Sequence, residues 1–157
     1  MLYKNIKGNF NIEARLSIKK SSAKSLEPDN GFQQSGIIVR NAAGKQENNL
    51  MISMGTGGNS IPKYFLKRTI NGKTKGLVEK TDSLVGWLRI EKRDTKISVY
   101  KRPDENSRWI KMDDYELGWL EDEVQVGFAV MARFAGDGPK QRPDMKAVFS
   151  KIQITKL

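Results

Sequence analysis

The sequence predicts a single all-β domain, and three observations support this prediction. Apolar and polar residues alternate with a period of two, most clearly from Asn9 to Ile18, which is the pattern of a half-buried strand. Turn-forming groups separate such runs, and Asn71-Gly72 is a strong signal for a two-residue hairpin loop. No segment keeps a helical period, and Met112 to Glu123 has room for a turn or two at most. Nine or ten short strands at this spacing are typical of an antiparallel sandwich or barrel.

Each expected strand rests on its own run of residues. In chain order the expected strands are Met1–Ile6, Asn9–Ile18, Ile37–Arg40, Leu50–Met54, Tyr64–Ile70, Trp87–Glu91, Ile97–Tyr100, Val124–Phe134 and Val148–Ile154. Most of them alternate, whereas Val124–Phe134 is apolar almost throughout, as expected of a central strand. The glycine-rich segment Gly55–Ser60 indicates a hairpin loop, because Pro62 and another strand-like run follow it where a phosphate-binding loop would need a helix.

Length and composition exclude several classes of protein. The chain has 157 residues, which suits one domain over residues 1–157. It contains no histidine and no cysteine, which excludes Ser–His–Asp and Cys–His catalysis, imidazole or thiolate metal sites, and disulfides. No apolar run reaches the roughly 18 residues of a membrane-spanning helix, so no transmembrane segment is expected.

The chain is strongly basic. Lys and Arg number 28 against 18 Asp and Glu, which gives a net charge of +10. Such a balance attracts polyanions, whether nucleic acids, anionic membrane surfaces or acidic polysaccharides. The longest basic stretches, Lys19-Lys20, Lys73–Lys75 and Lys92-Arg93, are short, and no RNA-binding signature is present. Nucleic acid is therefore not the expected partner.

Several motifs, in order along nearly the whole chain, resemble one family. They are Leu2-Tyr3-Lys4 with Gly8-Asn9-Phe10, Ser35–Arg40, Trp87–Glu91, Pro103–Trp109, Val126–Phe128, and Ala147–Phe149 with Ile152–Ile154. The sequence resembles the concanavalin A-like lectin/glucanase domains, and among them the domains of unknown function found alone or behind β-xylosidase-type glycosidases. It departs from their pattern at Asn9, where Asp is usual, and at Ser150-Lys151, which replaces an acidic pair.

This resemblance implies a jelly-roll β-sandwich and a carbohydrate context. It further implies an extracellular or periplasmic location in a bacterium; Met1–Ile6 itself reads as a strand and lacks the apolar segment of a signal peptide. No cofactor is expected, although members of this superfamily often hold calcium at an edge of the sandwich. Asp137 and Asp144 are the candidate oxygen ligands for such an ion.

Strand phase selects the candidate binding residues. If Ile37, Val39, Leu88 and Ile90 face the core, the opposite phase exposes polar and aromatic side chains on one concave sheet face. Aromatic rings stack on the apolar face of a sugar, and arginine donates paired hydrogen bonds to hydroxyls or a carboxylate. We therefore expect a carbohydrate ligand, with an acidic polysaccharide favoured by the charge. The candidate ligand-binding residues are Arg40, Trp87, Arg89, Tyr100 and Arg133, with Trp119 at the rim.

Each of these residues also has a structural interpretation. Arg40 and Arg89 would pair with Glu91 or Glu13 on neighbouring strands, and Trp87 would be a core aromatic, as would Trp109. Tyr100 would cap the rim of the sandwich, and Trp119 is as readily a loop anchor as a ligand platform.

Two alternatives to a binding role remain. Hydrolases of this superfamily carry carboxylates in a pattern like E-x-D-x-x-E on one strand, where alternation points all three into the cleft. That spacing is absent here, and Glu121-Asp122-Glu123 is contiguous, so no catalytic residue is assigned, although a glycoside hydrolase of this fold stays open. A structural module that packs on a partner enzyme is the second alternative, and it predicts an exposed apolar patch of several hundred Å².

Overall fold

Strands are the only regular secondary structure among the residues that the structure describes. The computed structural model describes residues 2–19, 32–42, 48–57, 61–134 and 145–157, and for residues 132–134 the backbone only. The strands in these ranges are β1 (Leu2–Lys7), β2 (Phe10–Lys19), β3 (Phe32–Asn41), β4 (Asn49–Thr56), β5 (Pro62–Ile70), β6 (Lys73–Lys80), β7 (Val85–Arg93), β8 (Lys96–Arg102), β9 (Ile110–Glu116), β10 (Glu123–Phe134) and β11 (Lys146–Lys156). Within the same ranges no helix is long and apolar enough to cross a membrane.

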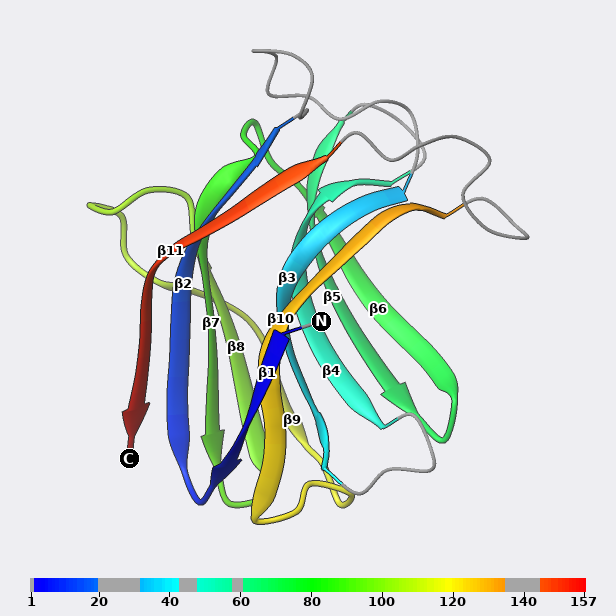
Figure 1. The fold of residues 1–157 in the computed structure, drawn as a ribbon, viewed down its shortest axis with the longest axis vertical. Helices are drawn as coiled ribbons and strands as arrows, with labels where there is room; N and C mark the ends of the chain where they lie inside the picture. Colours follow the sequence, from blue (N-terminus) through cyan, green and yellow to red (C-terminus); the bar gives the residue numbers. More distant parts are fainter. Residues whose placement is uncertain (1, 20–31, 43–47, 58–60, 135–144) are drawn as a thin grey trace.

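The strands form two packed sheets, as a jelly-roll sandwich requires (Figure 1). One sheet has six strands in the order β1-β10-β3-β4-β5-β6, and the other has five in the order β11-β2-β7-β8-β9. Neighbouring strands pair antiparallel throughout. Strand β10, from late in the chain, lies between β1 and β3, so the six-stranded sheet joins segments far apart in the sequence. The predicted all-β antiparallel sandwich is confirmed.

The core lies between the two sheets and follows the predicted period of two. Along β2 the apolar residues from Phe10 to Ile18 are at most 1% exposed, whereas Arg15 and Ser17 between them are partly exposed. Ile37 and Val39 of β3 face Leu88 and Ile90 of β7 across the same core. Burying an aliphatic side chain of this size stabilises the fold by about 1.5–3 kcal/mol, so these alternating rows supply most of the stability.

Strand β9 was not expected from the sequence, and β6 was implied only by the Asn71-Gly72 hairpin signal, with no run of its own to set its bounds. The side chains of β6 are almost all exposed, and β9 carries Asp113 and Asp114 between partly buried residues. Neither strand therefore has an apolar alternation to reveal it. The predicted hairpin loop between β5 and β6 is confirmed: Asn71 and Gly72 have φ angles of 50° and 75°, as a type I′ turn needs.

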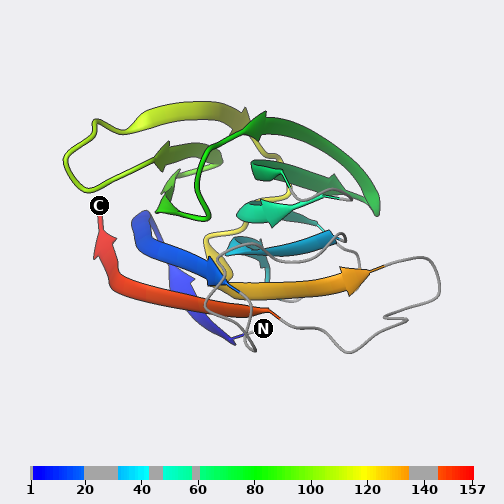
Figure 2. The same cartoon turned by 90° about the horizontal axis from the view of Figure 1, so that it is seen from above.

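One side of the sandwich is closed by aromatic packing between β10 and β11, which lie side by side (Figure 2). The ring centroids of Phe128 and Phe149 are 4.3 Å apart. Around them three large apolar side chains stay exposed: Leu2, Val130 and Ile152. A cavity of about 410 Å³ opens among the residues of this side.

Candidate functional site

The predicted site residues do not share one face. Trp87 and Arg89 lie on β7 and Tyr100 on β8, in the five-stranded sheet, whereas Arg40 lies on β3, in the six-stranded sheet. Both sets alternate with core residues, so they point away from the core on opposite sides of the molecule. The prediction of one shared face was wrong, because alternation fixes which way a side chain points but not which sheet holds its strand. Their role in ligand binding stays a prediction.

On the five-stranded sheet, tryptophan and arginine side chains are stacked on one another. The Arg102 guanidinium carbon lies 4.4 Å from the ring centroid of Trp87 and 4.6 Å from that of Trp109. Arg89 lies 4.0 Å from the Trp109 centroid, and Lys151 lies 5.6 Å from the Trp87 centroid. Trp87 is only 4% exposed although it points away from the core. The chain itself therefore covers the rings that a sugar would stack on.

Three cations of this outer face have carboxylate partners within the chain, whereas Arg102 donates only to the Glu105 backbone carbonyl. Arg89 donates from Nε and Nη2 to Glu13 Oε2, at 2.9 and 2.5 Å, so the expected pairing of Arg89 with Glu13 is confirmed. Lys151 Nζ lies 2.5 and 2.6 Å from the two carboxylate oxygens of Glu105, and its hydrogen bond lowers the pKa of that carboxyl. Lys96 pairs with Asp114 at 2.7 Å. These three cations therefore already have their counter-charge within the chain.

Tyr100 and Trp119 differ in how their rings are placed: Tyr100 is partly accessible on the outer face, and Trp119 packs against the core. Tyr100 is partly exposed beside Arg89, its partner in the β7–β8 register, and Lys111 Nζ lies 5.9 Å from its ring centroid. Trp119, between β9 and β10, packs against the core, and its carbonyl accepts a hydrogen bond of 3.4 Å from Asn41 Nδ2. Its indole nitrogen is buried without a hydrogen-bond partner among the described residues. Trp119 thus anchors its loop.

Three of the residues predicted to bind a ligand or calcium lie partly or wholly outside the described residues. The backbone of Arg133 belongs to β10, but its side chain lies outside the described residues. Asp137 and Asp144, the candidate calcium ligands, also lie outside them. Among the described residues no three acidic side chains gather in a way that would hold a metal ion.

The outer face of the six-stranded sheet has a different charge balance. This face consists of the side chains that alternate with the core residues on β1, β10, β3, β4, β5 and β6. Its cations are Lys7, Arg40, Lys63, Lys67 and Lys80, and its acidic side chain among the described residues is Glu123. Because Glu123 pairs with Lys7 in the register at the end of β1, the centre of the face has no described carboxylate.

Arg40 offers hydrogen-bond donors on this face. Its Nε donates to Gln125 Oε1 at 2.7 Å, and its guanidinium lies 5.4 Å from the ring centroid of Tyr3, which is half exposed. The two Nη groups have no further hydrogen bond or ion pair with a described residue. Gln125 and Tyr3 therefore orient the guanidinium while its outer edge stays available.

Lys67 lies in the middle of β5 on this face, whereas Arg40 is the last residue but one of β3. Lys67 pairs with Met51 on β4 and Gly76 on β6, and no described carboxylate lies within ion-pair distance of it. Partial burial lowers the pKa of the Lys67 amine from its ordinary value. Its Nζ lies 5.8 Å from the ring centroid of Phe65. An anion bound here would restore part of the solvation that this charge has lost.

The floor between these cations is polar and closely built. Ser53 and Gln34 are buried, and Ser53 Oγ lies 3.4 Å from Gln34 Oε1, while Gln34 Nε2 has no described partner. At Gly36 a Cβ would lie 1.9 Å from the Ile52 carbonyl oxygen, so β3 approaches β4 more closely than any side chain allows. Lys67, Gln34 and Ser53 belong to no motif, so the sequence alone does not point to them.

Comparisons with known proteins identify the fold. No family model matches the sequence, and neither does any curated protein. A functionally unknown protein from Saccharomyces cerevisiae superposes with a TM-score of 0.75 at 18% identity, over 99% of this chain and 74% of that one. A xylan β-1,4-xylosidase from Bacillus halodurans C-125 gives 0.70 at 11% identity, over 94% of this chain but only 28% of the enzyme. An alginate lyase from Klebsiella pneumoniae gives 0.62 at 12% identity, over 96% of this chain and 60% of that one. These likenesses confirm the predicted concanavalin A-like fold.

Proposed function

We propose that this concanavalin A-like jelly-roll domain binds an acidic polysaccharide, without cleaving it, on the outer face of its six-stranded sheet. The enzymes that share its fold include a xylosidase and alginate lyases, and this supports a carbohydrate ligand. A place of action outside the cytoplasm, extracellular or periplasmic, belongs to the same proposal.

The charge contrast between the two outer faces carries the proposal. On the five-stranded sheet Arg89, Lys96 and Lys151 each have a carboxylate partner. On the six-stranded sheet Arg40 and Lys67 have no described carboxylate partner. Holding a partly desolvated cation without a counter-charge costs free energy, and a ligand that supplies the counter-charge recovers it.

The chemistry of the face suits sugars that carry carboxylates. The free edge of Arg40 matches a carboxylate in a two-pronged hydrogen bond, and Lys67 acts as a compact point charge. Tyr3 offers a half-exposed ring for stacking beside Arg40. Arg40 and Lys67 lie two strands apart, a separation of roughly 10 Å at ordinary strand spacing, so they would contact different sugar units of one chain.

A binding role is favoured over hydrolysis because glycoside hydrolysis uses a pair of carboxyl groups flanking the bond that breaks. The described carboxylates at this face are Glu123 and, just before β10, Asp122, which lies 3.9 Å from Lys7 Nζ; both sit at one corner, away from the centre of the face. Release of reducing ends from a bound polysaccharide, abolished by replacing Glu123 with glutamine, would establish the hydrolase alternative instead.

A glycan array at low and at physiological salt is the first test. Polygalacturonate and its methyl ester, which has the same backbone without the charge, then separate carboxylate recognition from backbone recognition. We expect salt-resistant binding to the acid form and at least tenfold weaker binding to the ester. Arg40→Gln and Lys67→Gln should each weaken binding about tenfold, because each removes a charge-assisted interaction of about 1.5 kcal/mol.

The matched control is Lys96→Gln, which removes the same charge from the opposite face. It should leave the affinity unchanged. Equal losses in all three variants, with binding only at low salt, would mean that the net charge alone attracts the polymer. Loss on replacing Tyr100 or Arg89, with Arg40→Gln unaffected, would move the site to the five-stranded sheet.

The exposed apolar side chains beside Phe128 and Phe149 favour a second candidate function, packing on a partner enzyme. This patch is the one that such a role predicts, and the xylosidase is more than three times as long as the part of it that matches. The variant Ile152→Lys would disrupt docking there and leave glycan binding intact. If no glycan binds and Ile152→Lys alone prevents association with a catalytic domain, the packing role replaces the binding role.

A further inference from the structure

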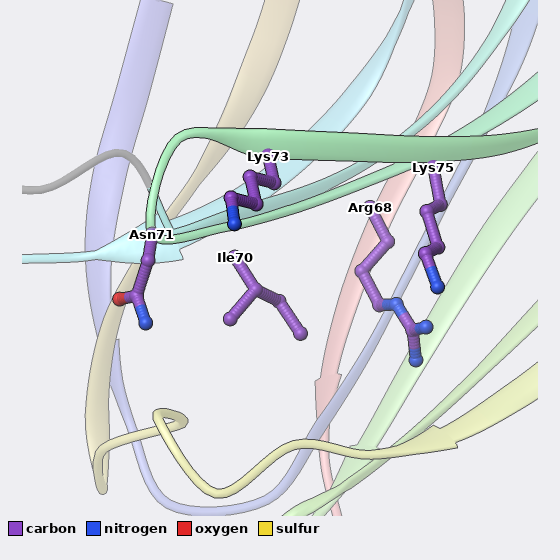
Figure 3. Close-up of a pocket in the computed structure, with 5 residues that line it drawn as sticks. All are labelled: Arg68, Ile70, Asn71, Lys73 and Lys75. Carbon is purple, nitrogen blue, oxygen red and sulfur yellow. The ribbon is translucent and has the colours of Figure 1, made fainter.

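A second basic site lies at the β5–β6 hairpin, on the other side of the six-stranded sheet from the proposed polysaccharide face. It is a cavity of about 340 Å³ lined by Arg68 and Ile70 of β5, Asn71 of the turn, and Lys73 and Lys75 of β6 (Figure 3). A volume of this size falls at the lower end of the range for small-molecule sites.

Strand register brings these side chains together. Leu66 of β5 is fully buried in the core, so alternation points Arg68 and Ile70 to the same side of the sheet. The register pairs Arg68 with Lys75 and Ile70 with Lys73, and Figure 3 shows Arg68 and Lys75 extending side by side. The cavity is thus built by the hairpin itself rather than by loops.

The opposite sheet fixes the position of Arg68. Its guanidinium lies 4.5 Å from the ring centroid of Tyr115 on β9. Burial, together with a hydrogen bond to Asp113, raises the pKa of Tyr115 to about 12, so the phenol stays neutral at physiological pH. The aromatic ring therefore holds the guanidinium in place without neutralising it.

The charge of the cavity has no counterpart in its walls. Three of its five described lining residues are cations, and none is acidic. Arg68 and Lys75 face each other directly across the two strands, an arrangement that like charges destabilise. The nearest acidic group facing them from β9, Asp113, hydrogen-bonds with Tyr115, and Glu79 of β6 pairs with Lys101. The fold thus keeps three cations around one cavity, where a bound anion would reduce their repulsion.

We infer that this cavity binds a tetrahedral oxyanion, a sulfate or phosphate group, carried by a sugar. The guanidinium fork of Arg68 and the ammonium group of Lys75 beside it can both donate to the oxygens of such a group, and Lys73 adds positive charge to the same cavity. A bare tetrahedral oxyanion has only five heavy atoms and fills part of a cavity of about 340 Å³, and Ile70 and Asn71 line the remaining space. This site is separate from the polysaccharide face and does not depend on the function proposed above.

The test compares five probes that differ in one feature at a time: glucose, glucose 6-sulfate, glucose 6-phosphate, inorganic sulfate and inorganic phosphate. Each is titrated into ¹⁵N-labelled protein, with the amides of Asn71 and Gly72 as local reporters. We expect saturable shifts of these amides with at least one of the two sugar esters, tenfold or more tighter than with the corresponding free ion, and none with glucose.

Arg68→Gln and Lys75→Gln should each weaken ester binding at least tenfold. Lys4→Gln, an exposed lysine on the strand at the opposite edge of the same sheet, is the matched control and should change nothing. Lys75 is exposed and its replacement leaves the Arg68–Tyr115 contact intact, so that variant reports on binding even if Arg68→Gln perturbs the fold.

Three results would overturn the inference. They are shifts spread over all lysine-rich surfaces, binding that Lys75→Gln leaves unchanged, and equal affinity for free ions and sugar esters. Failure here with intact polygalacturonate binding would leave the proposed function standing, and the reverse result would leave this site standing.

Discussion

Replacing Gly36 with alanine tests whether the close approach of β3 and β4 shapes the polysaccharide face. A Cβ at this position would lie 1.9 Å from the Ile52 carbonyl oxygen and 2.5 Å from the Ser53 Cα, whereas real Cβ contacts essentially never fall under 3.0 Å. Both of the obstructing atoms belong to the backbone, so no side chain can rotate away. The two strands must separate, and Ser53 and Gln34 would lose their positions in the floor of the face.

The size of the effect follows from two opposing contributions. Overpacking in a well-packed region costs about 1–3 kcal/mol, and a backbone obstruction belongs at the upper end of that range. Alanine also lowers the conformational entropy of the unfolded chain, which by itself stabilises the folded state by about 0.4–1 kcal/mol. We expect a net loss of about 2 kcal/mol in the free energy of unfolding. For a chain of this length that lowers Tm by about 4–8 °C, measured by circular dichroism.

Gly118→Ala is the control for this substitution. No heavy atom lies within 4 Å of the position that a Cβ would take there, so the added methyl group meets open space and Tm should stay the same or rise slightly. Because both variants restrict the unfolded chain alike, their difference isolates the contact at Gly36. Equal Tm values for the two variants would refute the argument from close approach.

Three further predictions concern charge. Glu13→Gln should lower the free energy of unfolding by about 1–2 kcal/mol, because the ion pair between Glu13 and Arg89 is mostly shielded from water. Glu91→Gln breaks the more exposed pair with Arg93 and should change that free energy by less than about 0.5 kcal/mol; urea denaturation measures both variants. Because burial lowers the pKa of Lys67, the amine loses its charge at a lower pH than an arginine at the same position would. As the pH is raised, the affinity of the wild-type protein for polygalacturonate should therefore begin to fall earlier than that of Lys67→Arg. Identical pH profiles of affinity for the two proteins would count against a contact between Lys67 and the ligand. The pKa of Tyr115 is raised to about 12 in the folded state, against about 10 in the unfolded chain. The neutral phenol therefore stabilises the fold fully below a pH of about 10, and this stabilisation is lost as the pH rises towards 12. Tyr115→Phe should remove that part of the alkaline loss of stability, measured by urea denaturation at several pH values.

The fold was predictable because its signal is local. Each residue of β2 reveals its side of the sheet through its immediate neighbours, and the apolar residues from Phe10 to Ile18 are buried as expected. The same logic fails for β6 and β9, which lie at edges of the two sheets. An edge strand with exposed side chains needs no apolar face, so its sequence carries no alternation to detect.

The site was predictable only in part because it depends on pairing between distant segments. Arg40 and Arg89 have the same phase in the sequence, but β10 pairs with β3 and places Arg40 in the other sheet from Arg89. Arg102 has no motif of its own: it lies opposite Trp87 in the β7–β8 register, and the loop that connects β8 to β9 brings Trp109 to it. Lys67 becomes a candidate only once the strand pairing is known, because its neighbours Met51 and Gly76 come from other strands and carry no charge.

The two proposed sites meet on a single strand, which allows them to be separated by neighbouring residues. Lys67 and Arg68 are consecutive in β5, so alternation points them to opposite sides of the sheet. Lys67→Gln should therefore weaken polygalacturonate binding and spare the sugar esters, and Arg68→Gln should do the opposite. Each variant removes one positive charge from the same place in the chain, so long-range attraction changes equally in both. If each variant weakened both classes of ligand to the same extent, the ligands would be sensing the charge of the hairpin as a whole and neither site would be specific. A crossed pattern of losses can arise only from two separate sites on the two sides of one sheet.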